Sequence, residues 1–331
     1  MNKQEVIQHI VGRAAAPVKS TGKASAPANI ALCKYWGKRN DELNLPVTSS
    51  LSVSLGSLGT TTTVEMISGK DETILNCRPV PDDTSFARRL RDYLNLFRPT
   101  TDTGFRVLTS NTIPTAAGLA SSASGYAALV KALDDLFGWN LPVRSLSILA
   151  RMGSGSASRS MYDGFVEWHA GVQDDGLDSF ADPISETWPG LTIGLVKISV
   201  AEKPVGSREA MKQTVTDSIL YRSWPDQVKR DLAIIHEAIR DRDFTRLGQT
   251  AENNALAMHA TAIATWPPTL FWLPESVKAM QKVWSLRQGG LPVYFTMDAG
   301  PNLKLLSETQ NVREIQKEFP DVEWVRPFDP A

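Results

Sequence analysis

Residues 114–125 read Pro-Thr-Ala-Ala-Gly-Leu-Ala-Ser-Ser-Ala-Ser-Gly, a run of small residues. It has no side chain larger than Leu119, and a helical pattern begins only as it ends. Small residues that lead into a helix N-terminus leave backbone N–H groups free to point at one anion, which the helix dipole also favours. The stretch therefore predicts a phosphate-binding loop, with a tightly packed Ala/Ser/Gly turn as the alternative. From Ser121 to a C-terminal cap expected at Gly138, apolar residues recur at helical spacing: Tyr126, Ala127, Val130, Leu133 and Phe137.

The composition excludes several classes of protein. The chain has 331 residues, of which 42% are hydrophobic, and this is enough to build two domains. Its 35 basic and 36 acidic residues give a net charge of −1, which argues against a protein that coats nucleic acid. Cys33 and Cys77 lie far apart, so they indicate reduced thiols and neither a zinc site nor a disulfide framework. With no signal-peptide core and no apolar run long enough to cross a bilayer, we expect a cytoplasmic protein that does not bind membranes.

Strand and helix patterns alternate along the chain and predict an α+β fold. The first half predicts strands at 26–32, 51–55, 60–66, 105–108 and 164–168, and helices at 84–97, 121–137 and 145–151. The second half predicts strands at 191–200 and 292–297, and helices at 228–239, 244–258, 277–284 and after Asp298 through Leu306. We therefore expect a partly flexible N-terminal extension at 1–22, an N-terminal domain at 23–190 and a C-terminal domain at 191–331.

Cationic and aromatic residues gather between Asn29 and Arg39, at the end of the first predicted strand. Lys34, Lys38 and Arg39 surround Tyr35 and Trp36. One interpretation is a cationic wall for a phosphorylated substrate. The other is a solvated basic turn whose aromatic side chains pack inward.

A second loop of small residues, Ser154-Gly-Ser-Ala-Ser-Arg159, follows the helix predicted at 145–151. Its hydroxyl and backbone N–H groups can hold a phosphate, and a guanidinium group can bind that phosphate through two parallel hydrogen bonds. The alternative is a Ser/Gly linker, which the short spacing to the strand at 164–168 disfavours. This loop therefore predicts an anion site.

Asp298 ends the strand at 292–297, within Thr-Met-Asp-Ala-Gly-Pro. A carboxylate at a strand end can be displayed into a cleft, although Asp before Ala-Gly-Pro is also an ordinary start of a turn. We regard His9 and His236 as incidental. His169 and His259 have no partner spacing for a metal site or a catalytic triad, and we expect them to be structural.

Five motifs follow one another in an order that resembles a known family. They are Asn-Ile-Ala-Leu-Cys-Lys-Tyr-Trp-Gly-Lys (29–38), Pro-Thr-Ala-Ala-Gly-Leu-Ala-Ser-Ser-Ala (114–123), Gly-Ser-Gly-Ser-Ala-x-Arg (153–159), Met-His-Ala-Thr (258–261) and Asp-Ala-Gly-Pro-Asn (298–302). Each motif is weak alone, but their order is specific. Together they resemble the mevalonate diphosphate decarboxylases of the GHMP kinase superfamily over about residues 24–306.

The resemblance implies a GHMP-kinase-like two-domain fold with the active site in the cleft between the domains. It implies an ATP-dependent decarboxylation of mevalonate 5-diphosphate to isopentenyl diphosphate, ADP, phosphate and carbon dioxide. The N-terminal domain would bind ATP, and the C-terminal domain would contribute the catalytic aspartate. Mg²⁺ is expected only as the partner of ATP, because the sequence shows no dedicated cage of carboxylates. A homodimer is also implied.

The same resemblance implies roles for individual residues. Asp298 would be the catalytic aspartate close to the C3 hydroxyl, with Lys34 as its partner. Substrate-binding positions would be Tyr35, Lys38, Ser154, Gly155, Ser156, Arg159 and Arg208. The ATP phosphate loop would comprise Pro114, Ala117, Gly118, Leu119, Ala120, Ser121, Ser122 and Ala123.

The chain departs from the family pattern at Ser158, where eukaryotic members often have Cys, and in the extension at 1–22. We expect neither departure to touch the chemistry. Three other functions stay open: the same reaction on mevalonate 5-phosphate, a kinase that phosphorylates the C3 hydroxyl without decarboxylation, and a ligand sensor without catalysis. Specificity for diphosphate over monophosphate depends on a few basic contacts that sequence alone does not position.

Overall fold

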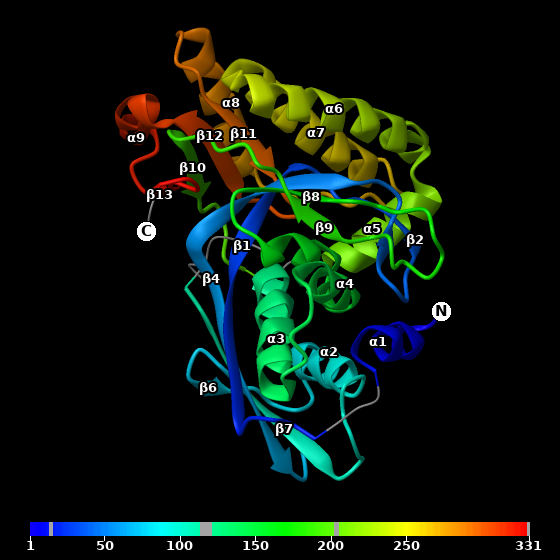
Figure 1. Ribbon diagram of the computed structural model, residues 1–331. Coiled ribbons are helices and arrows are strands. Elements are labelled where there is room, and N and C mark those ends of the chain that lie inside the picture. Colours follow the sequence, from blue (N-terminus) through cyan, green and yellow to red (C-terminus); the bar gives the residue numbers. More distant parts are fainter. Residues whose placement is uncertain (13–15, 113–120, 202–204, 330–331) are drawn as a thin grey trace.

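A seven-stranded sheet dominates the first half of the chain (Figure 1). The computed structural model describes residues 1–12, 16–112, 121–201 and 205–329. The strands lie in the order β6-β5-β7-β4-β8-β9, and β1 also pairs antiparallel with the long strand β4. A β-branched run, Thr60 to Val64, lies in the part of β4 that pairs with both β1 and β7. The strands are β1 (Thr21–Cys33), β4 (Ser50–Ser68), β5 (Glu72–Leu75), β6 (Arg78–Pro79), β7 (Thr103–Asn111), β8 (Phe165–Trp168) and β9 (Ala181–Pro183).

Helix α3 (Ser121–Phe137) packs along this sheet against β1 and β4. It ends at Gly138, whose φ of 63° is left-handed, as expected for the predicted cap. The prediction for the next helix, 145–151, was wrong at its start: the helix begins at Val143, with Pro142 as its N-cap. The other helices of this half are α1 (Lys3–Val11), α2 (Ser85–Leu94), α4 (Val143–Gly153) and the 3-10 helix η1 (Gly155–Met161).

The second half of the chain forms a four-stranded antiparallel sheet with helices packed on it (Figure 1). The strand order is β11-β12-β10-β13. The strands are β10 (Leu191–Val196), β11 (Tyr294–Met297), β12 (Leu303–Glu308) and β13 (Glu323–Val325). The helices are α5 (Ser207–Asp217), α6 (Trp224–Asp241), α7 (Phe244–Ile263), α8 (Pro274–Gln288) and α9 (Val312–Glu318), with short 3-10 turns η2 (Ile219–Ser223) and η3 (Thr309–Asn311). A small hairpin, β2 (Lys38–Asn40) and β3 (Leu45–Pro46), lies apart from both sheets in the pairing pattern.

The prediction for the segment after Asp298 was also wrong. We expected a helix through Leu306, but residues 303–308 form β12, which pairs with both β10 and β11. A short apolar run fits a buried strand as well as a helix, and neighbours on both sides decide the matter here. Five successive residues of β12 are consequently buried.

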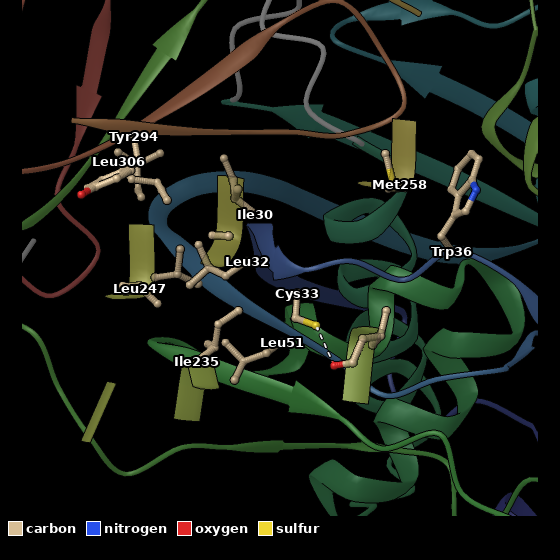
Figure 2. Packing of buried hydrophobic residues seen from close by; sticks show 14 of the residues in the cluster. Ile30, Leu32, Cys33, Trp36, Leu51, Ile235, Leu247, Met258, Tyr294 and Leu306 are labelled. Atoms are coloured by element: carbon tan, nitrogen blue, oxygen red, sulfur yellow. Dashed lines mark hydrogen bonds between the residues drawn. The ribbon is translucent and has the colours of Figure 1, made fainter. Parts of the chain in front are cut away.

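One hydrophobic core joins the two halves of the molecule (Figure 2). Ile30 and Leu32 of β1 and Leu51 of β4 pack in the same cluster as side chains of the second half, namely Ile235 of α6, Leu247 of α7, Tyr294 of β11 and Leu306 of β12. The end of β1 thus runs into the junction between the halves. This places the segment that follows β1, starting with Lys34, between them.

The N-terminal extension contains a helix, α1, which could not be predicted from the sequence pattern. In α1, Asn2 caps the backbone N–H of Glu5, whose carboxylate in turn accepts from the Asn2 backbone N–H. Val6 and Ile7 are fully buried in the same core cluster as Leu43 of the loop between β2 and β3. The helix is therefore docked on the N-terminal half, where it contacts α4.

Candidate active site

A cavity of about 170 Å³ lies at the junction between the two halves. All nine residues predicted for catalysis and substrate binding line it, and so do Ser122 and Ala123 of the predicted ATP loop. Pro114 and residues 117–120 of that loop lie outside the described residues, and Ser121 is described only as the backbone start of α3. The remaining lining residues are Asn29, Ala31, Trp36, Asn44, Ser207, Met211, Met258 and Ala299.

Asp298 contacts two lysines. Its Oδ1 lies 3.0 Å from Nζ of Lys34, and its Oδ2 lies 3.2 Å from Nζ of Lys304 on β12. Both lysine side chains are only 2% exposed, whereas that of Asp298 is 29% exposed and lines the cavity. Burial alone would raise the pKa of Asp298, but the two ammonium groups outweigh it and hold the pKa far below its ordinary value. Asp298 is therefore an ionised carboxylate throughout the physiological pH range.

Lys34 is fixed along its whole length. Its backbone N–H donates to Oδ1 of Asn254 on α7 at 2.8 Å, and its Nζ donates to the carbonyl of Ala31 at 2.8 Å as well as to Asp298. The amide nitrogen of Asn254 in turn donates to Asp231 of α6 at 2.8 Å. Burial lowers the pKa of Lys34 to about 8, since the attraction of Asp298 offsets only part of the cost of desolvation.

His259 of α7 holds the backbone of Asp298. Its Nε2 lies 3.1 Å from the carbonyl oxygen of Asp298, and burial lowers its pKa to about 3. The ring is therefore neutral, and Nε2–H must be the donor because a carbonyl oxygen only accepts. This is the structural kind of role expected for the histidine.

Arg159, Tyr35 and Gly155 form one wall of the cavity. The Arg159 guanidinium is buried and donates to Oγ of Ser50 and to Oδ1 of Asn29. The Tyr35 hydroxyl is buried, and it has no hydrogen-bond partner among the described residues. A hydroxyl left in this way beside a cavity can serve a ligand, because an unpaired buried polar group is costly.

Lys38 and Arg208 place positive charge at another part of the lining. Lys38 is paired loosely with Asp41, at 3.5 Å. Burial, followed by the charge of Arg208, lowers the pKa of Lys38, and the same two causes lower the pKa of Lys3 on α1. Cations gathered in this way can bind an anion that is not part of the chain.

A second cavity, of about 350 Å³, adjoins the first. Ser122, Ser207 and Arg208 line both cavities, so the two are continuous around the start of α3. Half of its other lining residues are apolar or aromatic, among them Leu90, Val107, Tyr126 and Leu129, and the polar ones are Thr62, Arg89, Thr109 and Asn111. Its size and lining are suited to a flat, partly polar ring system.

Sequence reasoning missed Lys304, Asn254 and the helix that carries Lys3. For Lys304 a signal was present, since a single lysine stands within the apolar run Leu-Lys-Leu-Leu at 303–306. In a buried strand such a lysine needs a partner charge. No group of three or more His, Cys, Asp or Glu residues within the described ranges could hold a metal ion. Nor is any helix in those ranges long and apolar enough to cross a membrane.

Comparison with known proteins gives a family for both halves of the chain. Residues 26–181 match the diphosphomevalonate decarboxylase-like N-terminal domain, and residues 194–322 match the mevalonate 5-diphosphate decarboxylase C-terminal domain. The diphosphomevalonate decarboxylase of Aspergillus fumigatus is 38% identical over 300 residues, which cover 84% of this chain and 74% of that protein. The enzyme of the same name from Danio rerio is 38% identical over 325 residues, covering 92% and 79%.

Comparison with solved structures gives the same family. The crystal structure of mevalonate diphosphate decarboxylase from Staphylococcus aureus has a TM-score of 0.87 and 39% identity, with 93% of this chain and 95% of that chain covered. The complex of MDDEF with MVAPP, AMPPCP and magnesium has a TM-score of 0.86 and 42% identity, with 93% and 97% covered. By sequence over most of its length and by fold, the chain belongs to the mevalonate diphosphate decarboxylase family.

Proposed function

We propose that the chain catalyses the ATP-dependent decarboxylation of mevalonate 5-diphosphate, giving isopentenyl diphosphate, ADP, phosphate and carbon dioxide. Membership of the family supports the reaction. The observation that carries the proposal for this chain is the ionised Asp298, which lines a cavity whose other charged side chains are cations: Lys34, Lys38, Arg159 and Arg208. Such a cavity suits a substrate with several negative charges and one alcohol to be activated.

In this proposal the two ends of the substrate bind to different cations. Lys38 and Arg208 bind the diphosphate, and the orphan hydroxyl of Tyr35 donates to it. Arg159 and Ser156 bind the carboxylate, since a guanidinium matches a carboxylate through two parallel hydrogen bonds. The C3 hydroxyl, which lies between the two ends, is then directed to Asp298.

ATP is proposed to enter from the second cavity. Its base and ribose occupy the apolar space beside Leu129 and Tyr126, while its phosphates reach the start of α3 near Ser122. Mg²⁺ fits this arrangement as a partner of the triphosphate, and the related complex of MDDEF with MVAPP, AMPPCP and magnesium supports this. When bound, Mg²⁺ neutralises charge on the phosphates during transfer.

The first step is phosphoryl transfer to the C3 oxygen. Asp298 accepts a hydrogen bond from the C3 hydroxyl and so directs a lone pair of the hydroxyl oxygen at the γ-phosphorus. A bond forms between the C3 hydroxyl oxygen and the γ-phosphorus. The bond between the γ-phosphorus and the β-γ bridging oxygen breaks, and its electron pair stays on ADP. A carboxylate of such low pKa is a weak base, so the hydroxyl proton leaves late in a loose transition state and ends in the solvent or on a phosphate.

The second step is fragmentation. The C3–O bond breaks and its electron pair leaves with phosphate, so positive charge develops at C3 next to the Asp298 carboxylate. The electron pair of the bond between C2 and the carboxyl carbon then forms the C2–C3 double bond, and carbon dioxide is released. One carboxylate therefore serves both steps, first as the group that orients the alcohol and then as the stabilising anion.

Substrate specificity, oligomeric state and cellular location are proposed as well. Activity on mevalonate 5-phosphate is the alternative substrate specificity, and the combined charge of Lys38 and Arg208 favours the diphosphate over it. We further propose a homodimer and a cytoplasmic location. Light scattering on a sizing column and cell fractionation, respectively, test these two.

The function is tested by supplying ATP and Mg²⁺ with mevalonate, its 5-phosphate and its 5-diphosphate in parallel, and measuring ADP and carbon dioxide. We expect carbon dioxide from the diphosphate alone. Carbon dioxide chiefly from the monophosphate overturns the substrate assignment, and ADP without carbon dioxide indicates a kinase.

The role of Asp298 is tested by Asp298→Asn, which keeps the shape but removes the charge. We expect kcat for carbon dioxide release to fall on the order of a thousandfold. Asp321→Asn, at an exposed aspartate of the same half, is the matched control and should behave as wild type. Near-normal turnover of a folded Asp298→Asn enzyme, as judged by circular dichroism, would rule out the assignment.

A further inference from the structure

Lys304 is a buried, charged side chain that the mechanism above does not use. It lies on β12, paired with Leu195 of β10 on one side and Thr296 of β11 on the other. It is only 2% exposed, and it does not belong to the lining of the cavity. A lysine placed in the middle of a sheet loses its hydration, which is costly unless a partner compensates it. Its partner is the Asp298 carboxylate at 3.2 Å.

The Asp298 side chain is held from two directions. Lys34 approaches Oδ1 from the end of β1, whereas Lys304 approaches Oδ2 from β12. The Lys304 ammonium also lies 3.5 Å from the carbonyl of Asn302. His259 fixes the Asp298 backbone carbonyl from α7. Two ion pairs and one backbone hydrogen bond thus determine both the position and the rotation of the carboxylate.

Neutralising one aspartate requires only one lysine, so the second needs another explanation. Two cations on one carboxylate leave a net positive charge, and the charge of Arg159 adds to it. Desolvating a second ammonium would be unfavourable if pairing were its only purpose. The arrangement does, however, keep Asp298 ionised when a strongly anionic substrate enters, because the substrate's charges would otherwise favour protonation of this carboxylate.

We propose that Lys304 is a positioning residue of the reaction: it fixes Oδ2 of Asp298, so that the carboxylate stays ionised and keeps one orientation toward the C3 hydroxyl. This inference rests on the proposed function. Lys304 itself touches neither the cavity nor the reacting atoms, and it acts through Asp298.

Removing the Lys304 charge has consequences for two other groups. The pKa of Asp298 rises, because one of the two cations that lower it is lost. The pKa of Lys34 also rises, because repulsion by Lys304 contributes to its lowering. The alkaline limb of the pH profile should therefore move to higher pH, which a general loss of structure would not produce. The titratable and charged groups around this centre are Lys34 after β1, Arg159 on η1, His259 on α7, Asp298 after β11 and Lys304 on β12.

The test compares wild type with Lys304→Met, Lys304→Gln and Lys304→Arg in the full chain. Lys278→Met, at an exposed lysine of the same half, is the control for loss of one charge. Release of ADP and carbon dioxide from ATP and mevalonate 5-diphosphate is followed between pH 5 and 10 to give kcat and KM. The titration of the substrate phosphates is common to all variants and cancels in the comparison.

We expect Lys304→Met to lower kcat on the order of ten- to hundredfold, with KM for ATP changed less than about twofold, since misaligning a group that acts in the transition state mainly affects kcat. At pH 9 wild type should retain about a tenth of its plateau kcat/KM, and Lys304→Met about half of its own, if the Lys34 pKa rises by one unit. Lys304→Arg should restore the wild-type profile.

Wild-type kcat and an unshifted profile in Lys304→Met would overturn the proposal. So would a uniform loss at every pH without movement of the alkaline limb, because that result indicates a purely structural lysine. If Lys304→Met does not fold by circular dichroism, Lys304→Gln is judged by the same two criteria. Absence of carbon dioxide from wild type would contradict the proposed function instead, and it is read before any variant is compared.

Discussion

The pKa of Lys34 leads to a prediction about alkaline pH that a single substitution can test. The change is Lys34→Arg, which keeps a positive charge beside Asp298. In wild type, burial lowers the pKa of Lys34 to about 8 from its ordinary value of 10.5. Above that pH the ammonium loses its proton, Asp298 loses one of its two cations, and the substrate anions lose a nearby positive charge. Activity should therefore fall on the alkaline side.

The size of the fall follows from the titration. One pH unit above its pKa, about a tenth of a group is still protonated, so kcat/KM at pH 9 should be about a tenth of its plateau. Arginine keeps its proton to about pH 12 or beyond, so the alkaline limb should disappear in Lys34→Arg. The profile of kcat should fall at higher pH than that of kcat/KM, because bound anionic substrate stabilises the ammonium form.

The assay measures initial rates of carbon dioxide release in quenched samples from pH 6 to 10, which avoids pH effects on coupling enzymes. Arginine is larger than lysine and the site is closed, so the height of the plateau will drop. The shape of the profile is the readout, and Lys278→Arg at an exposed position is the control. A limb that persists near pH 8 in Lys34→Arg would refute the reasoning and move the titration to another group, such as Lys38, whose pKa is also lowered.

Two further substitutions probe the cavity wall and the N-terminal helix. In Gly155→Ala the new Cβ would lie 2.8 Å from Cε1 of Tyr35 and 2.9 Å from Cη2 of Trp168, so both rings must shift. We expect the free energy of unfolding, measured with urea, to fall by about 1–3 kcal/mol. An unchanged midpoint of urea unfolding would contradict the packing described. Lys3→Met removes a cation whose pKa is lowered by burial and by Arg208; we expect KM for mevalonate 5-diphosphate to rise about threefold at unchanged kcat, since long-range charge acts mainly on binding. Lys70→Met, at an exposed lysine, should leave KM as it is, and equal KM values for both variants would show that the Lys3 charge has no part in binding.

Much of the fold could be predicted from local sequence patterns. The helix that begins at Ser121 and ends at Gly138 could be predicted because its apolar spacing and its cap agree. The strand at 303–308 was assigned as a helix, because a short apolar run has no period of its own and the two neighbouring strands that select the β conformation are distant in sequence. That error also hid Lys304, since on a helix a lysine of this run can reach solvent without a partner.

The N-terminal helix shows a different limit. The sequence Asn2-Lys-Gln-Glu5 has the spacing of a capping box, and Val6 and Ile7 follow it directly. A helix of nine residues is marginal alone, and it is the burial of these two side chains beside Leu43 that stabilises it. The burial depends on a docking surface built by residues far along the chain, so no local rule could predict it.

The candidate site could be assembled from motifs only through the resemblance, since Lys34 and Asp298 are 264 positions apart. What the structure adds is the electrostatic balance around the carboxylate. A general base works best with a pKa near the working pH, whereas a group that stabilises a developing cation must be ionised throughout. Two lysines on Asp298 favour the second requirement at the expense of the first. On this reasoning phosphoryl transfer proceeds without prior removal of the hydroxyl proton, and the carboxylate's permanent charge acts chiefly after transfer, when C3 loses its phosphate.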